Sequence, residues 1–267
     1  MYEPPEGIAP QDVLDLVRTG WDTEVSAIEH LPVGFGGWHW RAQSADGPRL
    51  FVTLDQRLWH TADSLEASYA GAVELSRDLD FVHAPPPHHG GTLTVPLGDG
   101  SLSCTRWLEG SRPEHFGSEA AELVRRLHRA PAPQGVPRWS PTVRDDLVDE
   151  LGAWSATAWT DGPLGEEARK HLLPALSLAR SGLTHYLALC RRIDPGTFVA
   201  THGEPHVHNQ WRTADGRLLL IDWETLRLAP PERDLGGGMA ELLPHDPAML
   251  RLLRLEWHLS GIRSFSD

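Results

Sequence analysis

A polar loop followed by an acidic strand end is the part of the sequence best suited to chemistry. The loop runs from His202 to Asn209 and contains Glu204, and Asp222 and Glu224 follow an apolar run further along the chain. Carboxylate and amide oxygens are ligands that Mg²⁺ takes together with substrate phosphates. A carboxylate beside such a metal can orient or deprotonate a substrate hydroxyl group. These residues therefore indicate a magnesium site beside a candidate base.

Short strands must position this loop. An apolar run, Phe198 to Ala200, precedes it, and Ala214 to Arg217 carries a turn signal. Leu218 to Ile221 then has the continuous apolar character of a buried strand, which ends at Asp222. This order predicts a hairpin that brings the polar loop close to the acidic strand end.

The two motifs resemble those of the aminoglycoside phosphotransferase family, a small-molecule branch of the protein-kinase-like fold. The family signature is H-G-D-x-H-x-x-N, followed by a hydrophobic strand that ends in D-x-D/E. This chain has His202-Gly203-Glu204-Pro205-His206-Val207-His208-Asn209 and then Ile221-Asp222-Trp223-Glu224. The resemblance implies an ATP-dependent (or GTP-dependent) phosphotransferase that acts on a hydroxyl group of a small molecule, by default an aminoglycoside-like antibiotic. A choline-like, amino-alcohol or sugar acceptor is nearly as plausible.

The resemblance also implies roles for individual residues. It places Glu204 at the catalytic-base position, although the family usually has an aspartate there, so the carboxylate is moved by about one methylene. His202 and His206 would fix the loop or contact phosphate. The implied metal ligands are Asn209 and Asp222, with Glu224 as a weaker metal or substrate candidate.

A glycine-rich turn near the N-terminus is the candidate phosphate-binding hairpin. Gly34, Gly36 and Gly37 lie between two strand-like runs, where glycine lets the backbone approach a ligand closely. By resemblance, this first hairpin covers the nucleotide phosphates, and the backbone from Thr105 to Trp107 hydrogen-bonds adenine. Without the resemblance, a plain tight hairpin is the more common meaning of such a turn.

The next strand, Leu50 to Leu54, departs from the family pattern. Kinase-like folds normally carry a lysine here that holds the α- and β-phosphates, and the alignment places Thr53 at that position. Lys170 is the only lysine in the chain and lies far away in sequence. Either Arg41 or Arg49 substitutes for the lysine, or the metal and the backbone do its work, or nucleotide binding is weak.

Three further acidic residues have both a family role and an ordinary structural one. Glu66 and Glu74 lie on the helix that normally supplies the glutamate partner of the strand lysine, and without that lysine we expect them to be solvated. Asp234 matches an aspartate that buttresses the catalytic loop in the family, and it is otherwise a helix N-cap.

Two other classes of protein stay open. One is a kinase-like protein that binds a ligand with little or no turnover, which the threonine at position 53 and the glutamate at position 204 favour. The other is a zinc-dependent hydrolase, since imidazole is a common metal ligand and His202, His206 and His208 lie within seven residues.

The composition of the chain limits the classes of binding partner and the cellular compartment that we expect. The chain has 267 residues and a net charge of −13, which argues against nucleic acid or an anionic membrane as the main partner. The acidity would attract a cationic acceptor, or it serves solubility alone. Only two cysteines, Cys104 and Cys190, are present, and neither a signal peptide nor a membrane-spanning stretch is recognisable, so we expect a cytoplasmic protein.

The predicted fold is a two-lobed, protein-kinase-like α+β fold. The N-terminal lobe, residues 1–107, should be a small antiparallel sheet with a helix, and the C-terminal lobe, residues 108–267, should be mainly helical and hold the catalytic hairpin. Apolar periodicity predicts helices over residues 10–20, 62–79, 118–130, 144–154, 166–192 and 248–259.

Overall fold

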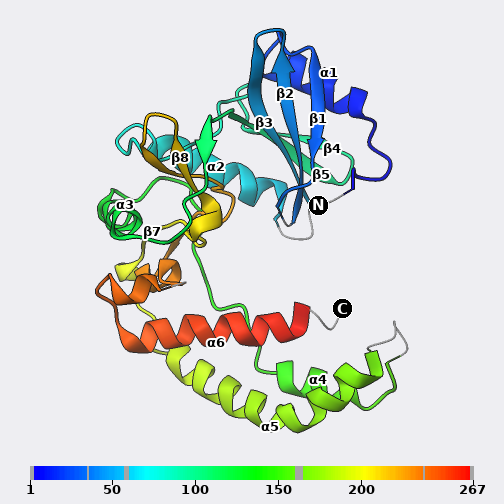
Figure 1. The fold of residues 1–267 in the computed structure, drawn as a ribbon. Helices are drawn as coiled ribbons and strands as arrows, with labels where there is room; N and C mark the ends of the chain where they lie inside the picture. The colour runs from blue at the N-terminus through cyan, green and yellow to red at the C-terminus, as the bar shows by residue number, and fades with distance from the viewer. Residues whose placement is uncertain (1–2, 35, 57–59, 160–164, 237, 265–267) are drawn as a thin grey trace.

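The computed structural model describes residues 3–34, 36–56, 60–159, 165–236 and 238–264. An antiparallel sheet comes first and a mainly helical region follows, so the sequence prediction of a mixed α+β fold is confirmed. In Figure 1 the sheet lies at one end of the molecule and helices α4, α5 and α6 lie at the other. The hairpin predicted to hold the catalytic site lies between them.

The sheet has five strands in the order β1-β2-β3-β5-β4, and each neighbouring pair is antiparallel. The strands are β1 (Ala27–Leu31), β2 (Gly37–Ser44), β3 (Gly47–Gln56), β4 (Thr94–Leu97) and β5 (Gly100–Arg106). Helix α1 (Pro10–Gly20) shares a hydrophobic core with one face of the sheet. Because side chains alternate along a strand, Val52 and Leu54 enter that core while Thr53 and Asp55 project to the other face.

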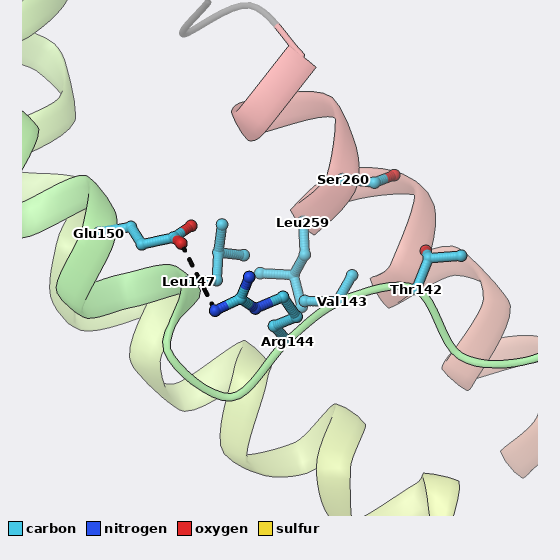
Figure 2. Close-up of a pocket in the computed structure, with 7 residues that line it drawn as sticks. All are labelled: Thr142, Val143, Arg144, Leu147, Glu150, Leu259 and Ser260. Carbon is cyan, nitrogen blue, oxygen red and sulfur yellow. Dashed lines mark ion pairs between the residues drawn. The ribbon is translucent and has the colours of Figure 1, made fainter. Parts of the chain in front are cut away.

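The helical end of the molecule has a hydrophobic core of its own. Helices α4 (Leu147–Ser155), α5 (Gly165–Cys190) and α6 (Pro247–Ser264) pack around buried Tyr186, whose hydroxyl group donates to the Glu256 carboxylate at 2.8 Å. A cavity of about 200 Å³ lies between α4, α6 and the segment before α4 (Figure 2). It contains the Arg144–Glu150 ion pair at 3.9 Å, and none of the predicted site residues lines it. The predicted site residues therefore lie outside this cavity.

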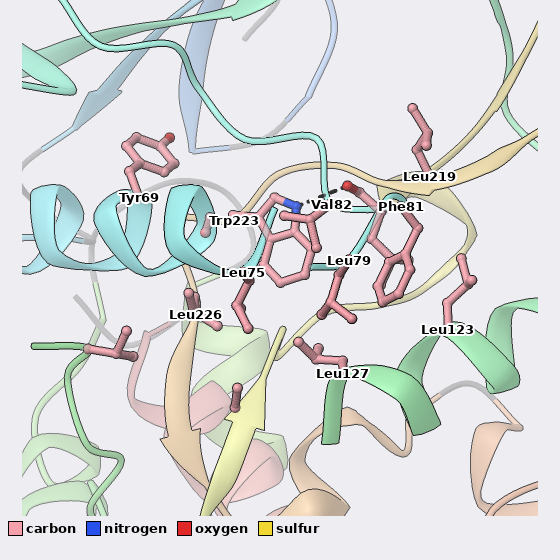
Figure 3. Packing of buried hydrophobic residues seen from close by; sticks show 14 of the residues in the cluster. Tyr69, Leu75, Leu79, Phe81, Val82, Leu123, Leu127, Leu219, Trp223 and Leu226 are labelled. Carbon is pink, nitrogen blue, oxygen red and sulfur yellow. Dashed lines mark hydrogen bonds between the residues drawn. The ribbon is translucent and has the colours of Figure 1, made fainter. Parts of the chain in front are cut away.

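Helix α2 (Ala62–Leu75) links the sheet to the rest of the molecule. It begins at Thr61, whose side chain accepts from the Ser64 amide at 3.2 Å, and ends four residues earlier than the periodicity predicted. Its buried side chains pack with α3 (Ser118–Arg129) and with the strand-end tryptophan Trp223 in one core (Figure 3). Helix α2 thereby places its residues next to the acidic strand end.

Glu66 on α2 is not the solvated charge that the sequence led us to expect. Its carboxylate accepts from the amides of Leu93 and Thr94, at 2.8 and 2.9 Å, and from the Thr94 hydroxyl group at 2.9 Å. Glu74 accepts from the Gln134 amide at 3.1 Å. Both carboxylates therefore hold other backbone segments of the protein against α2, and they do so without a lysine partner.

Two small sheets carry the catalytic loop. One has the order β6-β8-β9, with β6 (Gly110–Ser111), β8 (Gln210–Thr213) and β9 (Leu218–Leu220), and the other pairs β7 (Val199–Thr201) with β10 (Arg227–Ala229). The hairpin at the turn from Ala214 to Arg217 is therefore real. Its first arm is β8, whereas the apolar run before the loop forms β7 and pairs with β10. Among the described residues, no helix is both long and apolar enough to cross a membrane.

Candidate active site

The polar loop lies directly against the acidic strand end, as the hairpin requires. The Ile221 amide donates to the Asn209 carbonyl at 3.0 Å, which ties the last residue of the loop to the residue before Asp222. The His202 Nε2 donates to the Ile221 carbonyl at 2.8 Å and ties the first residue of the loop to the same place. The structure therefore holds the predicted base, Glu204, and the predicted metal acid on one rigid unit.

His202 is a structural residue of this unit. It is completely buried, its ring centroid lies 4.6 Å from that of Trp223, and burial lowers its pKa. Its Nδ1 accepts from the Glu204 amide at 3.4 Å, so both ring nitrogens bond to the backbone. The zinc-hydrolase interpretation is therefore wrong about His202, which has no nitrogen left to join His206 and His208 around a metal. Within the described ranges, no three His, Cys, Asp or Glu side chains are placed to hold a metal ion together.

Asp234 buttresses the loop, as the resemblance implied. Its carboxylate accepts from the His202 amide at 3.1 Å, from the Gly203 amide and from His128 Nε2 at 2.9 Å. Burial acts to raise the pKa of Asp234, but these hydrogen bonds and the nearby imidazoles bring it below its ordinary value. Arg233 adds bonds to Thr201 Oγ1 and to the Thr225 carbonyl, both at 2.9 Å.

Glu204 is partly exposed and lies beside His206. The carboxylate and the imidazole Nε2 are 3.7 Å apart, and both side chains are close to half exposed. The ion pair with His206 lowers the pKa of Glu204 and raises the pKa of His206. Glu204 is thus ionised at neutral pH and can accept a hydrogen bond from a substrate hydroxyl group.

Asn209, at the end of the polar loop, has a side-chain amide that the loop backbone holds in place. Its Nδ2 donates to the Glu204 carbonyl at 3.0 Å, which fixes the side-chain amide. The oxygen, an acceptor, is then the atom suited to a cation.

Asp222 has an unusual backbone conformation. Its φ angle is 71°, and it is the only non-glycine with positive φ among the residues that the structure describes. Such a conformation costs on the order of 1 kcal/mol or more, is adopted by aspartate more often than by most residues, and recurs at active sites. The Asp222 side chain is exposed, whereas the next residue, Trp223, is buried in the core.

Glu224 is a partly buried acid, and one of its carboxylate oxygens, Oε2, is buried. Among the described residues no group pairs with its Oε2. Burial and the charge of Asp222 raise its pKa well above the ordinary value. An orphaned carboxylate oxygen near a second carboxylate suits Mg²⁺, which takes one or two protein carboxylates plus water and phosphate oxygens. The residues present therefore fit a magnesium ion held by Asn209, Asp222 and Glu224.

Sequence reasoning missed a third acid at this place. Asp55, at the end of β3, accepts from the Tyr69 hydroxyl group at 3.4 Å. Burial and the charge of Asp222 raise its pKa to about 7. The signal was present in the sequence, because Asp55 lies two residues after Thr53 and so projects from the same face of the strand.

The glycine turn lies over the same face of the sheet. Gly34 and Gly36 have φ angles of 78° and 88°, which only glycine adopts readily, and Gly37 begins β2. A Cβ atom at position 34 would lie 2.6 Å from Nε2 of His39, so the turn closes directly on that imidazole. His39 is paired with Thr53 across the β2–β3 ladder.

The predicted adenine-binding backbone is partly occupied by the protein itself. The Trp107 amide donates to the Arg49 carbonyl at 2.9 Å, and the Arg106 carbonyl bonds to His83 Nε2 at 2.9 Å. Thr105 lies within β5 and pairs with Phe51. The Trp107 amide is therefore unsuited to bind a base, while its ring lies 6.5 Å from that of Phe51.

Comparisons with known proteins identify the family and the fold of this chain. The model of the phosphotransferase enzyme family matches residues 28–259. A search among curated protein sequences finds no match. The crystal structure of spectinomycin phosphotransferase APH(9)-Ia, bound to ADP and spectinomycin, superposes with a TM-score of 0.75 at 15% identity and covers 97% of this chain and 88% of that chain.

Two further structures are similar. Amicoumacin kinase hAmiN has a TM-score of 0.60 at 9% identity, with coverage of 94% of this chain and 78% of that chain. Choline kinase LicA from Streptococcus pneumoniae has a TM-score of 0.52 at 11% identity, with coverage of 95% and 90%. These likenesses confirm the kinase-like α+β fold. Since the family model spans the sheet, the catalytic loop and the strand-end acids, this chain belongs to the phosphotransferase enzyme family and is a small-molecule kinase.

Proposed function

We propose that this protein transfers the γ-phosphoryl group of ATP, or of GTP, to a hydroxyl group of a small cationic molecule. One observation carries the proposal: the hydrogen bonds from Ile221 to Asn209 and from His202 to Ile221 hold a candidate base beside the strand-end acids. The three proteins with similar structures are a spectinomycin phosphotransferase, an amicoumacin kinase and a choline kinase, and the first two contain ADP and AMP-PNP, respectively.

Each site residue has a defined task in this reaction. Asn209, Asp222 and Glu224 would hold Mg²⁺, which neutralises charge on the phosphates when bound. Glu204 accepts a hydrogen bond from the acceptor hydroxyl group and aligns its oxygen with the phosphoryl group. His206 keeps Glu204 ionised, and the buried His202 fixes the loop. Catalysis is then mainly positioning and electrostatic stabilisation.

We infer that the acceptor carries a positive charge. The chain has a net charge of −13, which favours a cationic acceptor over an anionic one. The similar structures include one with spectinomycin bound and a choline kinase. Choline is a quaternary ammonium alcohol, so an amino or ammonium alcohol, including an aminoglycoside-like antibiotic, is the acceptor class to test first.

A thermal-shift titration tests nucleotide binding first. A ligand that binds only the folded protein raises its melting temperature by mass action. We expect ATP with Mg²⁺ to raise it and ATP with EDTA to raise it much less. ATP consumption should then be measured with choline, amino alcohols, aminoglycosides and sugars as acceptors. Magnesium-dependent binding without turnover on any acceptor would favour the ligand-binding alternative over the kinase.

Two substitutions separate metal binding from base catalysis. Asp222→Ala should abolish phosphoryl transfer, and a nearly unchanged rate would remove the metal assignment. Glu204→Gln should lower kcat by about a hundredfold or more with little change in KM for ATP, which is the usual size of general-base catalysis. Asp99→Ala, in the exposed turn between β4 and β5, is the matched control.

A further inference from the structure

His39 occupies the face of the sheet on which the family's strand lysine would lie. It is the direct cross-strand partner of Thr53 in the β2–β3 ladder. Its Nδ1 lies 3.2 Å from Thr53 Oγ1. Directly paired residues of antiparallel strands project from the same face. The missing lysine position and the imidazole therefore form one polar pair.

The imidazole is fixed between the glycine turn and the sheet. Its ring stacks on Phe51, with centroids 5.0 Å apart and an interplanar angle of 27°. With Nδ1 directed at Thr53, the opposite nitrogen, Nε2, lies beside Gly34, where any Cβ atom would approach it to 2.6 Å. The glycine at this position thus allows the turn to close over His39, and Nε2 lies at the side of the ring that the turn covers.

The two arginines considered as replacements for the lysine are engaged elsewhere. Arg49 pairs with Asp22 and, at 3.2 Å, with Glu24, both in the segment that follows α1. Arg41 pairs with Glu29 on β1 and lies 5.9 Å from the centre of the Trp107 ring. Among Arg41, Arg49 and His39, only His39 makes a hydrogen-bonding contact with the Thr53 side chain, at 3.2 Å.

We propose that His39, through Nε2, contacts the nucleotide phosphates in place of the strand lysine. The inference rests on the proposed function, because it assumes that a nucleotide binds beneath the glycine turn. Burial lowers the pKa of His39 to about 4, and the charge of Asp222 across the site opposes that shift while His30 and Arg112 add to it. The imidazole is thus neutral and provides a hydrogen bond rather than a full charge.

Calorimetric titration with a non-hydrolysable ATP analogue and with adenosine, both in the presence of Mg²⁺, tests the proposal. His39→Ala should weaken binding of the analogue by about tenfold to a hundredfold, the usual effect of losing a hydrogen bond to a charged group, and leave adenosine binding unchanged. His30→Ala is the matched control, because His30 pairs with Trp40 on the neighbouring strand and so projects from the opposite face. An equal loss for both ligands would show that His39 supports the base-binding region and would overturn the phosphate contact.

Two more variants keep the test independent of folding. His39→Gln places an amide near the position of Nε2, and His39→Asn places one near Nδ1, so we expect the glutamine variant to retain more affinity for the analogue. In the double variant His39→Ala/Thr53→Lys, the restored lysine should recover the affinity. Failure of that recovery, together with equal affinities for the two amide variants, would contradict the proposal. If the unmodified protein binds neither ligand, the proposed function itself is wrong.

Discussion

Replacing Asp55 by asparagine should stabilise the protein, and increasingly so as the pH rises. The Asp55 carboxyl group lies between the Tyr69 hydroxyl group, 3.4 Å away, and the charge of Asp222. Burial and that charge raise its pKa from 3.8 to about 7. Asparagine keeps an oxygen that can accept from Tyr69 but never becomes charged.

The size of the effect follows from proton linkage. Between pH 3.8 and about pH 7 the folded protein keeps a proton on Asp55 that the unfolded chain has lost. The free energy of unfolding therefore falls as the pH rises through this window. A shift of about three pKa units at about 1.4 kcal/mol each corresponds to roughly 4 kcal/mol at pH 8. At pH 5 somewhat less than half of that loss has accumulated.

Chemical denaturation of both proteins at several pH values between 5 and 8 measures this difference. The stability advantage of Asp55→Asn should grow by about 3 kcal/mol across that range. Asp99→Asn, at an exposed turn, should show no such trend. If the stability curves of Asp55→Asn and the unmodified protein run parallel from pH 5 to pH 8, Asp55 is not held neutral by its surroundings and the reasoning fails.

Three other predictions concern the catalytic loop. The pKa of His206 is raised in the folded protein, so its pairing with Glu204 stabilises the fold below about pH 6.5. This stabilisation is lost as the pH rises through the pKa that His206 has in the folded protein. His206→Ala should therefore remove this pH dependence from thermal melts. Gly203→Ala would place a Cβ atom 2.4 Å from Arg233 at a φ angle of 97°, and we expect a loss of about 1–3 kcal/mol in denaturation together with reduced kcat. Asp234→Ala leaves two backbone amides and His128 without their acceptor and should cost about 3 kcal/mol or more, whereas unchanged stability would contradict its role as a buttress.

The sequence predicted the site best where the candidate site residues are contiguous in the chain. His202 to Asn209 and the strand that ends at Asp222 are each contiguous, so a motif could identify them before any contact was known. The hairpin turn was predicted correctly for the same reason. The order of sheet and helices followed from apolar periodicity, because each element buries one face.

Residues whose role depends on pairing between strands could not be found in this way. Nothing local in the sequence relates His39 to Thr53, since their contact depends on the β2–β3 register, which includes a bulge near Gln43. The same holds for Arg41 and Arg49, whose acidic partners lie on other segments. The cross-strand partners of such side chains can be identified only when the register of the sheet is known.

The distribution of charge explains how nucleotide could bind without the family's lysine. Thr53 and a neutral His39 offer hydrogen bonds but no positive charge. Across from them, Asp222 raises the pKa of both Asp55 and Glu224, which shows that these acids repel one another. A free nucleotide, itself a polyanion, would add to that repulsion, whereas a nucleotide that carries a divalent cation relieves it. Under the proposed function, we therefore expect the replacement of lysine to shift charge neutralisation from the protein to the metal, and to make the dependence on Mg²⁺ stronger here than in a kinase that keeps the lysine.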